Sequence, residues 1–417
     1  MTTQKTFVIV GAGLAGSKAA EALRTEAFDG RVVLIGEEAE RPYDRPPLSK
    51  DYLQGKVDKE KIYVHPEKWY AEHDVELRLE SRVTGIDLVA HQLIAQNDER
   101  IDYDKLLVTT GSSPRVLPVP GSDLDGVLYL RGIQDCEAIK SAFASAKRVA
   151  IIGAGWIGLE TAAAARAAGV DATVIETAKL PLLGVLGREL AEIYAALHRE
   201  HGVELRMEVE VAEIVVADHR ASGVRLADGS CIEADVVIVG VGITPNVELA
   251  EEAGLTVDNG IVVNEYLASS DPDVFAAGDV ANAFYPSLGR SLRLEHWSAA
   301  LNQGPAAAAN MVGRNAAYDH VPYFFSDQYD MGMEYWGNVE AGSYDRVIFR
   351  GDVATREFIA FWLRKGQVVA AMNVNVWDVG DAITALIRSG GQVDTGRLAD
   401  PDVSLDALHG RFPAEAK

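Results

Sequence analysis

The chain has 417 residues, of which 48% are hydrophobic and 24% charged, and its formal net charge is −23. This composition is ordinary for an enzyme of two or three domains and does not indicate disorder. The negative charge argues against general binding to nucleic acid or to anionic membrane, because both surfaces would repel the protein as a whole. No apolar run approaches the ~20 residues of a membrane span, so we expect a cytoplasmic protein.

The first predicted elements are an apolar strand over residues 6–10, a glycine-rich turn and an alanine-rich helix. The turn contains Gly11, Gly13 and Gly16. Glycines let the backbone turn tightly and approach a pyrophosphate, whose charge the helix N–H groups can bind. After a second strand, Glu37 stands 26 residues beyond the first glycine, where a carboxylate can hold an adenosine ribose. The pattern is typical of a Rossmann dinucleotide site, although one such turn alone can be merely structural.

The same pattern occurs again after an apolar strand over residues 148–152. The second turn contains Gly153, Gly155 and Gly158, and Glu176 follows 23 residues beyond the first of them. The two copies also end alike, since Gly111 and Gly242 each follow a buried-looking strand and each precede a proline by three residues. Two such units predict two dinucleotide sites.

Between these landmarks the sequence predicts smaller elements. Alternating residues at 83–88 and 212–217 are typical of small antiparallel sheets, and residues 137–147 favour a helix. Aromatic, strand-like segments follow Phe325 and include a hairpin around Lys365 and Gly366. The predicted domains are residues 1–113 with 246–325, residues 114–245, and residues 326–417.

Cysteine and histidine usage gives no sign of a metal or disulfide site. Only Cys136 and Cys231 are present, 95 positions apart, which excludes a disulfide framework and a cysteine metal site. We interpret both as packing residues. The histidines show no metal-ligand spacing, and we expect most of them on the surface: His65, His73, His198, His201, His296 and His320.

Further motifs are spread over nearly the whole chain. They are Arg-Pro-Pro-Leu-Ser-Lys at 45–50, Thr-Thr-Gly at 109–111, Leu-Arg at 130–131, Gly-Trp-Ile-Gly-Leu-Glu at 155–160, Val-Phe-Ala-Ala-Gly-Asp-Val at 274–280 and Phe-Ser-Asp-Gln-Tyr at 325–329. With the glycine turns, they resemble the FAD-dependent, NADH-oxidising ferredoxin reductases, a group that includes putidaredoxin reductase and the reductases of bacterial ring-hydroxylating dioxygenases. The resemblance implies an α/β fold with two Rossmann-like domains, in the glutathione-reductase-like flavoprotein architecture, plus a C-terminal α+β domain.

By this resemblance the first unit holds FAD, with the glycine turn at the pyrophosphate, Val83 near the adenine and Asp279 on the ribityl chain. Arg131 would lie against the flavin, and Trp297 would stack on its ring system. The alternatives are a turn aspartate, a surface arginine and a core aromatic residue. The full set implied for FAD is Gly11, Gly13, Leu14, Ala15, Gly16, Glu37, Arg45, Lys50, Val83, Thr110, Gly111, Arg131, Gly278, Asp279, Glu295 and Trp297.

The resemblance also implies that Lys50 and Glu160 form a buried pair beside the reactive edge of the flavin. Taken alone, each has a plainer interpretation, as a solvated lysine after a proline turn and a glutamate on a helix face. No other acid or base is required, because the chemistry belongs to the cofactor.

The second unit is implied to hold NADH. The residues concerned are Gly153, Gly155, Ile157, Gly158, Glu160, Glu176 and Gly242. A carboxylate at Glu176 accepts hydrogen bonds from a ribose 2′-hydroxyl but repels a 2′-phosphate, so we expect NADH rather than NADPH as the donor. Lys179 is the one nearby cation that argues against this preference.

The implied activity is the transfer of a hydride from NADH to FAD and then of single electrons to a ferredoxin that serves an oxygenase, which we take to be a cytochrome monooxygenase. A rubredoxin reductase, or a flavin- and NADH-binding protein of the apoptosis-inducing-factor type, remains an alternative. The missing cysteines count against a disulfide reductase and a flavin oxidase or peroxidase. Ferredoxins are commonly acidic, so a docking site needs local basic residues, for which Arg290, Arg293 and Arg314 are candidates.

Overall fold

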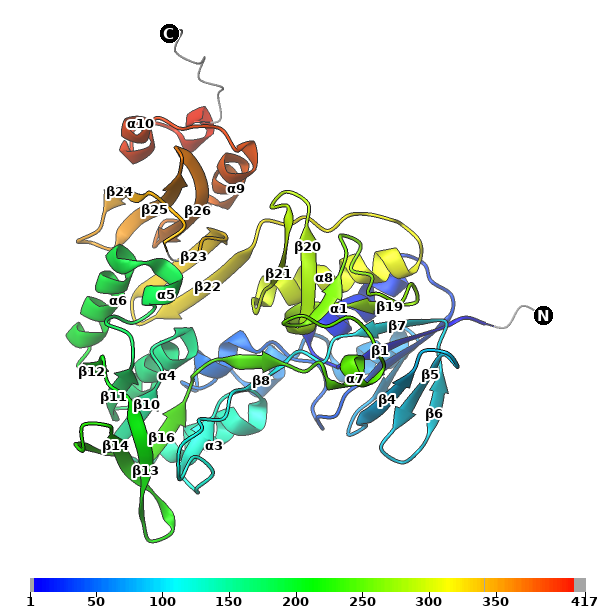
Figure 1. Ribbon diagram of the computed structural model, residues 1–417, viewed down its shortest axis with the longest axis horizontal. Helices are drawn as coiled ribbons and strands as arrows, with labels where there is room; N and C mark the ends of the chain where they lie inside the picture. Colours follow the sequence, from blue (N-terminus) through cyan, green and yellow to red (C-terminus); the bar gives the residue numbers. More distant parts are fainter. Residues whose placement is uncertain (1–3, 341, 409–417) are drawn as a thin grey trace. The chain divides into compact units, whose positions relative to one another are not determined.

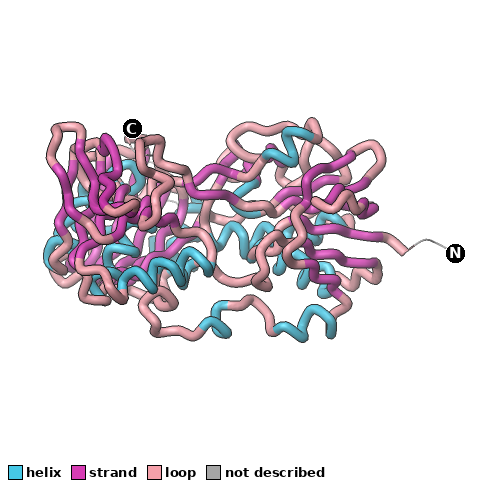
Figure 2. Tube along the Cα trace, turned by 90° about the horizontal axis from the view of Figure 1, so that it is seen from below, coloured by secondary structure: helices cyan, strands magenta, loops and turns pink. Residues whose placement is uncertain are grey.

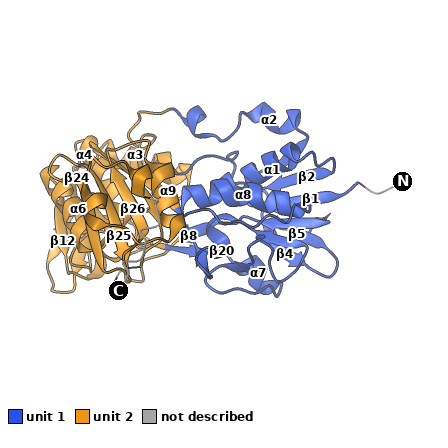
Figure 3. Cartoon of the chain, turned by 90° about the horizontal axis from the view of Figure 1, so that it is seen from above, with its two compact units in different colours: residues 1–45, 58–113, 243–322 blue, residues 46–57, 114–242, 323–417 orange. Residues whose placement is uncertain are grey.

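A computed structural model describes residues 4–340 and 342–408 of the chain (Figure 1). Figure 2 marks its helices, strands and loops. The chain divides into two compact units (Figure 3). Unit 1 consists of Met1–Arg45, Asp58–Ser113 and Ile243–Pro322, and unit 2 of Pro46–Val57, Pro114–Gly242 and Tyr323–Lys417. The second and third predicted domains therefore fall mostly within one unit, and their separation stays a prediction.

Unit 1 is built on a parallel sheet of five strands. Their order is β19 (Val274–Ala276), β7 (Lys105–Val108), β1 (Thr6–Val10), β2 (Arg31–Ile35) and β3 (Val75–Arg78). The central strands are continuous apolar runs because both faces of such a sheet are covered. Helices α1 (Leu14–Thr25) and α8 (Trp297–Met311) pack against each other, and small buried residues such as Ala19, Ala20 and Ala307 allow this close approach.

Unit 2 repeats this arrangement. Its parallel sheet has the order β12 (Glu204–Met207), β11 (Asp171–Glu176), β10 (Arg148–Ile152), β16 (Val236–Val239) and β9 (Val127–Tyr129). Helix α4 (Trp156–Ala167) packs on β10 and β11. The four strands β12, β11, β10 and β16 match β3, β2, β1 and β7 in order and direction. The repeat predicted from the glycine turns is confirmed.

The two predicted small antiparallel sheets are also confirmed. The first contains β4 (Val83–Asp87), β5 (Gln92–Ala95) and β6 (Arg100–Asp102), and the second β13 (Val211–Ala217), β14 (Arg220–Leu226) and β15 (Cys231–Glu233). The helix predicted over residues 137–147 was misplaced, because α3 spans Ile133–Phe143. Asp135 fixes its start by accepting a hydrogen bond from the N–H of Gly132 at 2.7 Å, which is a helix cap that the sequence prediction missed.

The C-terminal part of unit 2 is an antiparallel sheet. Its order is β22 (Tyr323–Gln328), β23 (Met331–Gly337), β26 (Gln367–Val374), β25 (Glu357–Arg364) and β24 (Arg346–Asp352). Strands β25 and β26 form the predicted hairpin, with Lys365 and Gly366 at positive φ in its turn. Phe361 and Leu363 pack against Ile383 and Leu386 of α9 (Gly380–Ser389), which covers one face of the sheet.

The remaining elements are short, apart from α6, or connect the sheets. They are η1 (Pro46–Ser49), η2 (Lys59–Ile62), α2 (Glu67–Glu72), β8 (Ser112–Pro114), α5 (Leu183–Leu186), α6 (Arg188–Glu200), β17 (Ile243–Pro245), α7 (Glu248–Glu252), β18 (Ile261–Val263), η3 (Gly278–Val280), β20 (Ala281–Tyr285), β21 (Arg290–Arg293), α10 (Thr395–Ala399) and η4 (Leu405–Leu408). Within residues 4–340 and 342–408, no helix has the length and apolar character needed to cross a membrane.

Two expectations about side-chain environment were wrong. Most of the six named histidines were expected on the surface, but of these six only His73 and His320 are exposed, and His65 and His198 are buried. Cys231 is exposed and accepts a hydrogen bond from Arg225, while Cys136 is buried as expected. Among the described residues, no group of three or more His, Cys, Asp or Glu side chains is placed to hold a metal ion.

Candidate functional site

The first glycine turn joins β1 to α1 in unit 1. The N–H of Gly11 donates to the carbonyl oxygen of Ile35 at 2.8 Å, and Gly11 has a φ of +114°. A Cβ at Gly11 would lie 2.1 Å from the carbonyl oxygen of Thr109, so only glycine fits. At Gly13, by contrast, an added Cβ would meet no atom of the described residues within 4 Å. The backbone is therefore open at the helix N-terminus, where a pyrophosphate fits.

The second glycine turn joins β10 to α4 in unit 2 and has the same geometry. The N–H of Gly153 donates to the carbonyl oxygen of Ile175 at 2.8 Å, and a Cβ at Gly153 would lie 2.3 Å from the carbonyl oxygen of Gly240. Gly155 is open in the same sense as Gly13, with nothing described within 4 Å of an added Cβ. In the described chain, neither α1 nor α4 has a side-chain cap or an acidic residue in its first turn. Both N-termini are thus suited to an anionic group.

The two acidic residues after the second strands are held differently. Glu37 is exposed, and its Oε2 lies 3.9 Å from Nε of Arg82. Glu176 accepts hydrogen bonds from the N–H groups of Ala154 at 2.8 Å and Ala178 at 3.0 Å. Burial alone would raise the pKa of Glu176, but these N–H donors outweigh it and lower the pKa. Glu176 is therefore a fixed carboxylate at neutral pH.

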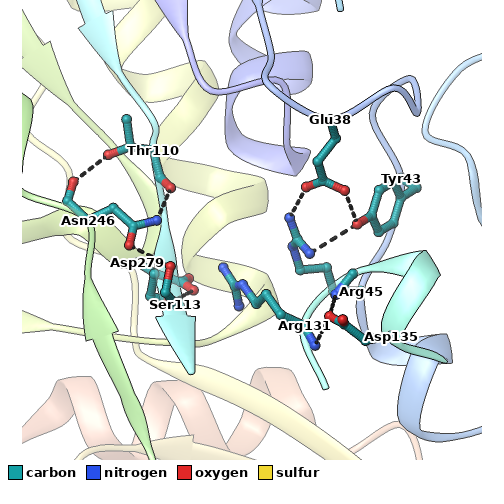
Figure 4. Close-up of polar contacts among 11 residues, drawn as sticks. Glu38, Tyr43, Arg45, Thr110, Ser113, Arg131, Asp135, Asn246 and Asp279 are labelled. Carbon is teal, nitrogen blue, oxygen red and sulfur yellow. Dashed lines mark hydrogen bonds and ion pairs between the residues drawn. The ribbon is translucent and has the colours of Figure 1, made fainter. Parts of the chain in front are cut away.

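Arg45 lies in a charged cluster of unit 1 that sequence reasoning did not find. Its guanidinium donates to Oε1 of Glu38 at 2.8 Å and to the hydroxyl of Tyr43 at 3.1 Å (Figure 4). Burial opposes the charge of Arg45, but Tyr43, Glu38 and Asp279 outweigh this effect and raise its pKa. The sequence signal for this cluster, which was missed, is that Glu38, Tyr43 and Arg45 follow closely after the second strand.

Other predicted FAD residues of unit 1 are tied into hydrogen bonds. The hydroxyl of Ser112 donates to Asp279 at 2.8 Å. The side chain of Asn246 donates to the carbonyl oxygen of Thr110 at 2.9 Å (Figure 4). The N–H of Gly278 donates to Gln303 at 2.9 Å. These contacts fix the segments that carry Thr110, Gly111, Gly278 and Asp279. Val83 is buried on β4, and Leu14 and Ala15 begin α1.

Three residues at and just before the start of α8 form hydrogen bonds or ion pairs. The indole N–H of Trp297 donates to Asp44 at 2.8 Å, so this residue is not simply a core aromatic. Glu295 pairs with Arg293 at 2.7 Å, and the Arg293 side chain is only 8% exposed. Arg293 is therefore a poor candidate for docking a partner. Arg314, another of the three candidates, is exposed but forms an ion pair with Glu26 at 2.6 Å.

Three predicted site residues of unit 2, Arg131, Ile157 and Gly242, lie on or beside different elements. The backbone N–H of Arg131 donates to Asp135 at 2.9 Å at the start of α3 (Figure 4). Ile157 is 44% exposed on the first turn of α4. Gly242 has a φ of +103°, and its carbonyl oxygen accepts a hydrogen bond from the N–H of Arg115.

Lys50 and Glu160 form a buried ion pair within unit 2. Lys50 Nζ lies 2.9 Å from Oε2 of Glu160, and the two residues are 9% and 3% exposed. The hydroxyl of Ser49 also donates to Oε2, and that of Ser326 donates to Oε1 at 2.7 Å. Such a pair repays its desolvation only when further hydrogen bonds satisfy the carboxylate, as they do here. Both serines lie in the motifs at 45–50 and 325–329, but their convergence on Glu160 was not predicted.

His198 should make the protein sensitive to acid. Burial lowers its pKa from 6.5 to about 4. Between these values the unfolded chain binds a proton that the folded chain does not, so the free energy of unfolding falls as the pH drops from 6.5 to 4, by about 3 kcal/mol. We expect His198→Gln to flatten this slope in denaturant unfolding at stepped pH. Exposed His73→Gln is the control, and equal slopes in the two variants would contradict the assignment.

The fold and its two glycine turns define an oxidoreductase with two dinucleotide sites. Residues 5–304 match the family model of the pyridine nucleotide-disulphide oxidoreductases, and residues 323–409 match the reductase C-terminal model. The chain belongs to this family, and within it to the FAD-dependent NADH:ferredoxin reductases. The predicted fold class, enzyme class and cofactors, FAD with NADH as donor, are confirmed.

Relatives of known activity and solved structures match over almost the whole chain. The ferredoxin–NAD(+) reductase component of the anthranilate 1,2-dioxygenase system of Burkholderia cepacia is 41% identical over 408 residues, which cover 96% of this chain and 98% of the relative. The ferredoxin reductase for the CYP199A2 system of Rhodopseudomonas palustris is 35% identical with a TM-score of 0.93, covering 96% and 99%. The reductase in the covalent putidaredoxin reductase–putidaredoxin complex is 36% identical with a TM-score of 0.91, covering 96% and 97%.

Proposed function

We propose that this protein takes a hydride from NADH and delivers single electrons to a ferredoxin that serves an oxygenase. The observation that carries the proposal is the pair of glycine turns of equal geometry, each followed by a carboxylate. When bound, FAD accepts the hydride and releases its two electrons one at a time. The relatives support a ferredoxin partner, because one is named as a ferredoxin–NAD(+) reductase and another is solved in complex with putidaredoxin.

The residues divide between the two nucleotides in this proposal. The α1 N-terminus, Glu37, Asp279 and the other residues predicted for FAD hold that cofactor, so residues 1–113 and 246–325 form its domain. The α4 N-terminus, Glu176 and Gly242 hold NADH in residues 114–245. Lys50 and Glu160 provide a fixed pair of charges beside the reacting rings, while residues 326–417 form the third domain.

Two finer features are part of the proposal. The terminal oxygenase is a cytochrome monooxygenase, in line with the CYP199A2 system to which one solved relative belongs. The protein works in the cytoplasm, in keeping with its net charge of −23 and its lack of long apolar runs. Fractionation of cells that express the chain, followed by detection of the protein in each fraction, tests the second feature.

Glu176 should make the protein prefer NADH over NADPH by on the order of a hundredfold in kcat/KM, because a like charge beside the 2′-phosphate costs several kcal/mol. Replacing Glu176 with glutamine removes the charge and should reduce the preference about tenfold. Glu233→Gln, a change at an exposed residue that pairs with Arg148, is the control. Equal kcat/KM values for NADH and NADPH in the parent protein would show that Glu176 does not select the donor.

The proposed activity is tested by NADH-driven reduction of cytochrome c, with and without each ferredoxin from the same genome. We expect cytochrome c reduction to depend strongly on one ferredoxin. A dependence on rubredoxin instead would favour the rubredoxin reductase alternative. A slow reaction with NADH and no ferredoxin reduction would favour a binding protein of the apoptosis-inducing-factor type.

A further inference from the structure

Unit 2 contains a buried chain of hydrogen bonds to which the proposed function gives no role. It begins at the hydroxyl of Tyr329, which lies 3.2 Å from Nδ1 of His198. His198 Nε2 lies 2.8 Å from Oε1 of Gln328, and Nε2 of Gln328 donates to the hydroxyl of Ser326 at 3.1 Å. The Ser326 hydroxyl donates in turn to Oε1 of Glu160 at 2.7 Å. The chain therefore ends on the carboxylate that pairs with Lys50.

The chemistry of the groups fixes the direction of every bond. A carboxylate only accepts, so the hydroxyl of Ser326 must donate to Glu160 and accept from the amide nitrogen of Gln328. The amide oxygen of Gln328 then accepts from His198, which must carry its proton on Nε2. Nδ1 of His198 accepts from Tyr329. Burial lowers the pKa of His198 to about 4, which keeps this ring neutral at pH 7. Every donor in the chain points toward Glu160.

Such a chain is suited to hold a charge and not to conduct protons. The side-chain amide of Gln328 stands in its middle, and an amide neither gains nor loses a proton near neutral pH. The other oxygen of Glu160 accepts from the hydroxyl of Ser49 and lies 2.9 Å from Lys50 Nζ. Both carboxylate oxygens therefore have fixed donors, and the orientation of the group is determined.

Strand β22 brings Ser326 and Gln328 of this hydrogen-bond chain together. Ser326 and Gln328 are two residues apart, so their side chains lie on the same face of the strand. Both are buried, whereas Asp327 between them is exposed. The motif at residues 325–329 thus places two polar side chains, Ser326 and Gln328, on one buried face of β22.

We propose that Ser326, Gln328 and His198 are positioning residues that keep the carboxylate of Glu160 hydrogen-bonded and aimed at Lys50. The C-terminal sheet would then set the charge beside the reacting rings. This inference rests on the proposed function, because only there does the Lys50–Glu160 pair take part in hydride transfer.

The other charged and titratable groups that face Glu160 show why these donors matter. Lys50 is the cation that forms an ion pair with Glu160. Asp327 is exposed, but neighbouring atoms desolvate its carboxyl in part and raise its pKa, against the charge of Lys50, which lowers it, and together with that of Glu160, which raises it. Burial also raises the pKa of Tyr194, again with a contribution from Glu160. The charge of Lys50 thus acts on two carboxylates, and of these two described groups only Glu160 forms an ion pair with it, while hydroxyl donors hold both oxygens of Glu160.

The test compares Ser326→Ala with Ser326→Thr, which keeps the hydroxyl. In Ser326→Ala we expect flavin reduction by NADH to slow about tenfold, and the acidic limb of its pH profile to move upward by about one pH unit. The infrared difference spectrum between neutral and acidic pH should show the band of a protonated carboxyl at correspondingly higher pH. Ser326→Thr should recover both properties, and exposed Ser145→Ala should leave them unchanged.

Gln328→Met provides a second variant that leaves the Ser326 hydroxyl in place but removes its donor, and it should move the acidic limb in the same direction by a smaller amount. In a Glu160→Gln background, Ser326→Ala should change the pH profile no further, since the ionising group is gone. A reduced melting temperature with an unmoved acidic limb would show a purely structural role and overturn the inference. Lys50→Met distinguishes failure of the positioning role from failure of the role proposed for the Lys50–Glu160 pair. If Lys50→Met leaves flavin reduction unchanged, the role of the pair itself is wrong.

Discussion

Replacing Lys50 with methionine is expected to slow flavin reduction by NADH by about ten- to a hundredfold. Methionine matches the length of the lysine stem, so the change removes the charge without opening a large cavity. The carboxylate of Glu160, which is 3% exposed, then loses the cation 2.9 Å away. An uncompensated buried charge costs about 3–5 kcal/mol, so the free energy of unfolding should fall as well. Rapid-mixing absorbance and denaturant unfolding measure the two effects.

Two further variants show that the loss comes from the buried pair. Lys56→Met removes an exposed lysine from the same segment, 3.9 Å from Asp51, and should change neither the rate nor the stability. Adding Glu160→Leu to Lys50→Met removes the unpaired carboxylate and should recover stability without recovering the rate. An unchanged rate with unchanged NADH affinity in Lys50→Met would exclude any role of this pair.

Replacing Gly153 or Gly155 of the second turn with alanine should affect the stability of the fold very differently. Gly153→Ala should destabilise the fold by about 2 kcal/mol or more, because its φ is +105° and the new Cβ would lie 2.3 Å from the carbonyl oxygen of Gly240. Gly155→Ala has a φ of −78°, and its Cβ meets no described atom within 4 Å. Its stability should change by less than about 0.5 kcal/mol.

The functional effect of Gly155→Ala is expected on NADH alone. The new methyl group enters the space where the pyrophosphate approaches the backbone, so the affinity for NADH should fall at least about tenfold, which corresponds to about 1.4 kcal/mol. FAD content measured by absorbance is the control, because that cofactor is assigned to the turn at Gly11 and Gly13. A stable Gly155→Ala variant with unchanged NADH affinity would show that the pyrophosphate binds elsewhere.

The sequence predicted those parts of the site that depend on local geometry. A strand, a turn with glycines and a helix follow one another directly in the chain, so the pattern of residues was sufficient to assign Gly11 and Gly153 to their turns. The start of α3 was missed because a single cap by Asp135 determines it. Contacts between distant residues could not be read in the same way. Ser49 and Ser326 meet at Glu160 across 111 and 166 positions of sequence.

His198 shows the limit most clearly. It was one of six histidines of which most were expected on the surface, yet it is fully buried. Burial became possible because Gln328, 130 positions away, satisfies Nε2 of the ring. No sequence pattern within α6 predicts that Gln328 is the hydrogen-bond partner of His198. The local sequence thus predicts the two glycine turns to which the dinucleotides are assigned, while the fold determines which polar groups surround Glu160.

The central claim is a directed electron path from NADH through FAD to a ferredoxin, and anaerobic mixing tests it most directly. The protein is mixed first with NADH and then with the cognate ferredoxin, while the absorbances of flavin and ferredoxin are followed. A hydride carries two electrons, so the account predicts bleaching of the flavin by NADH and then its recovery as two ferredoxins are reduced for each NADH. Flavin that NADH does not bleach, or that recovers its colour without reducing ferredoxin, would contradict the account.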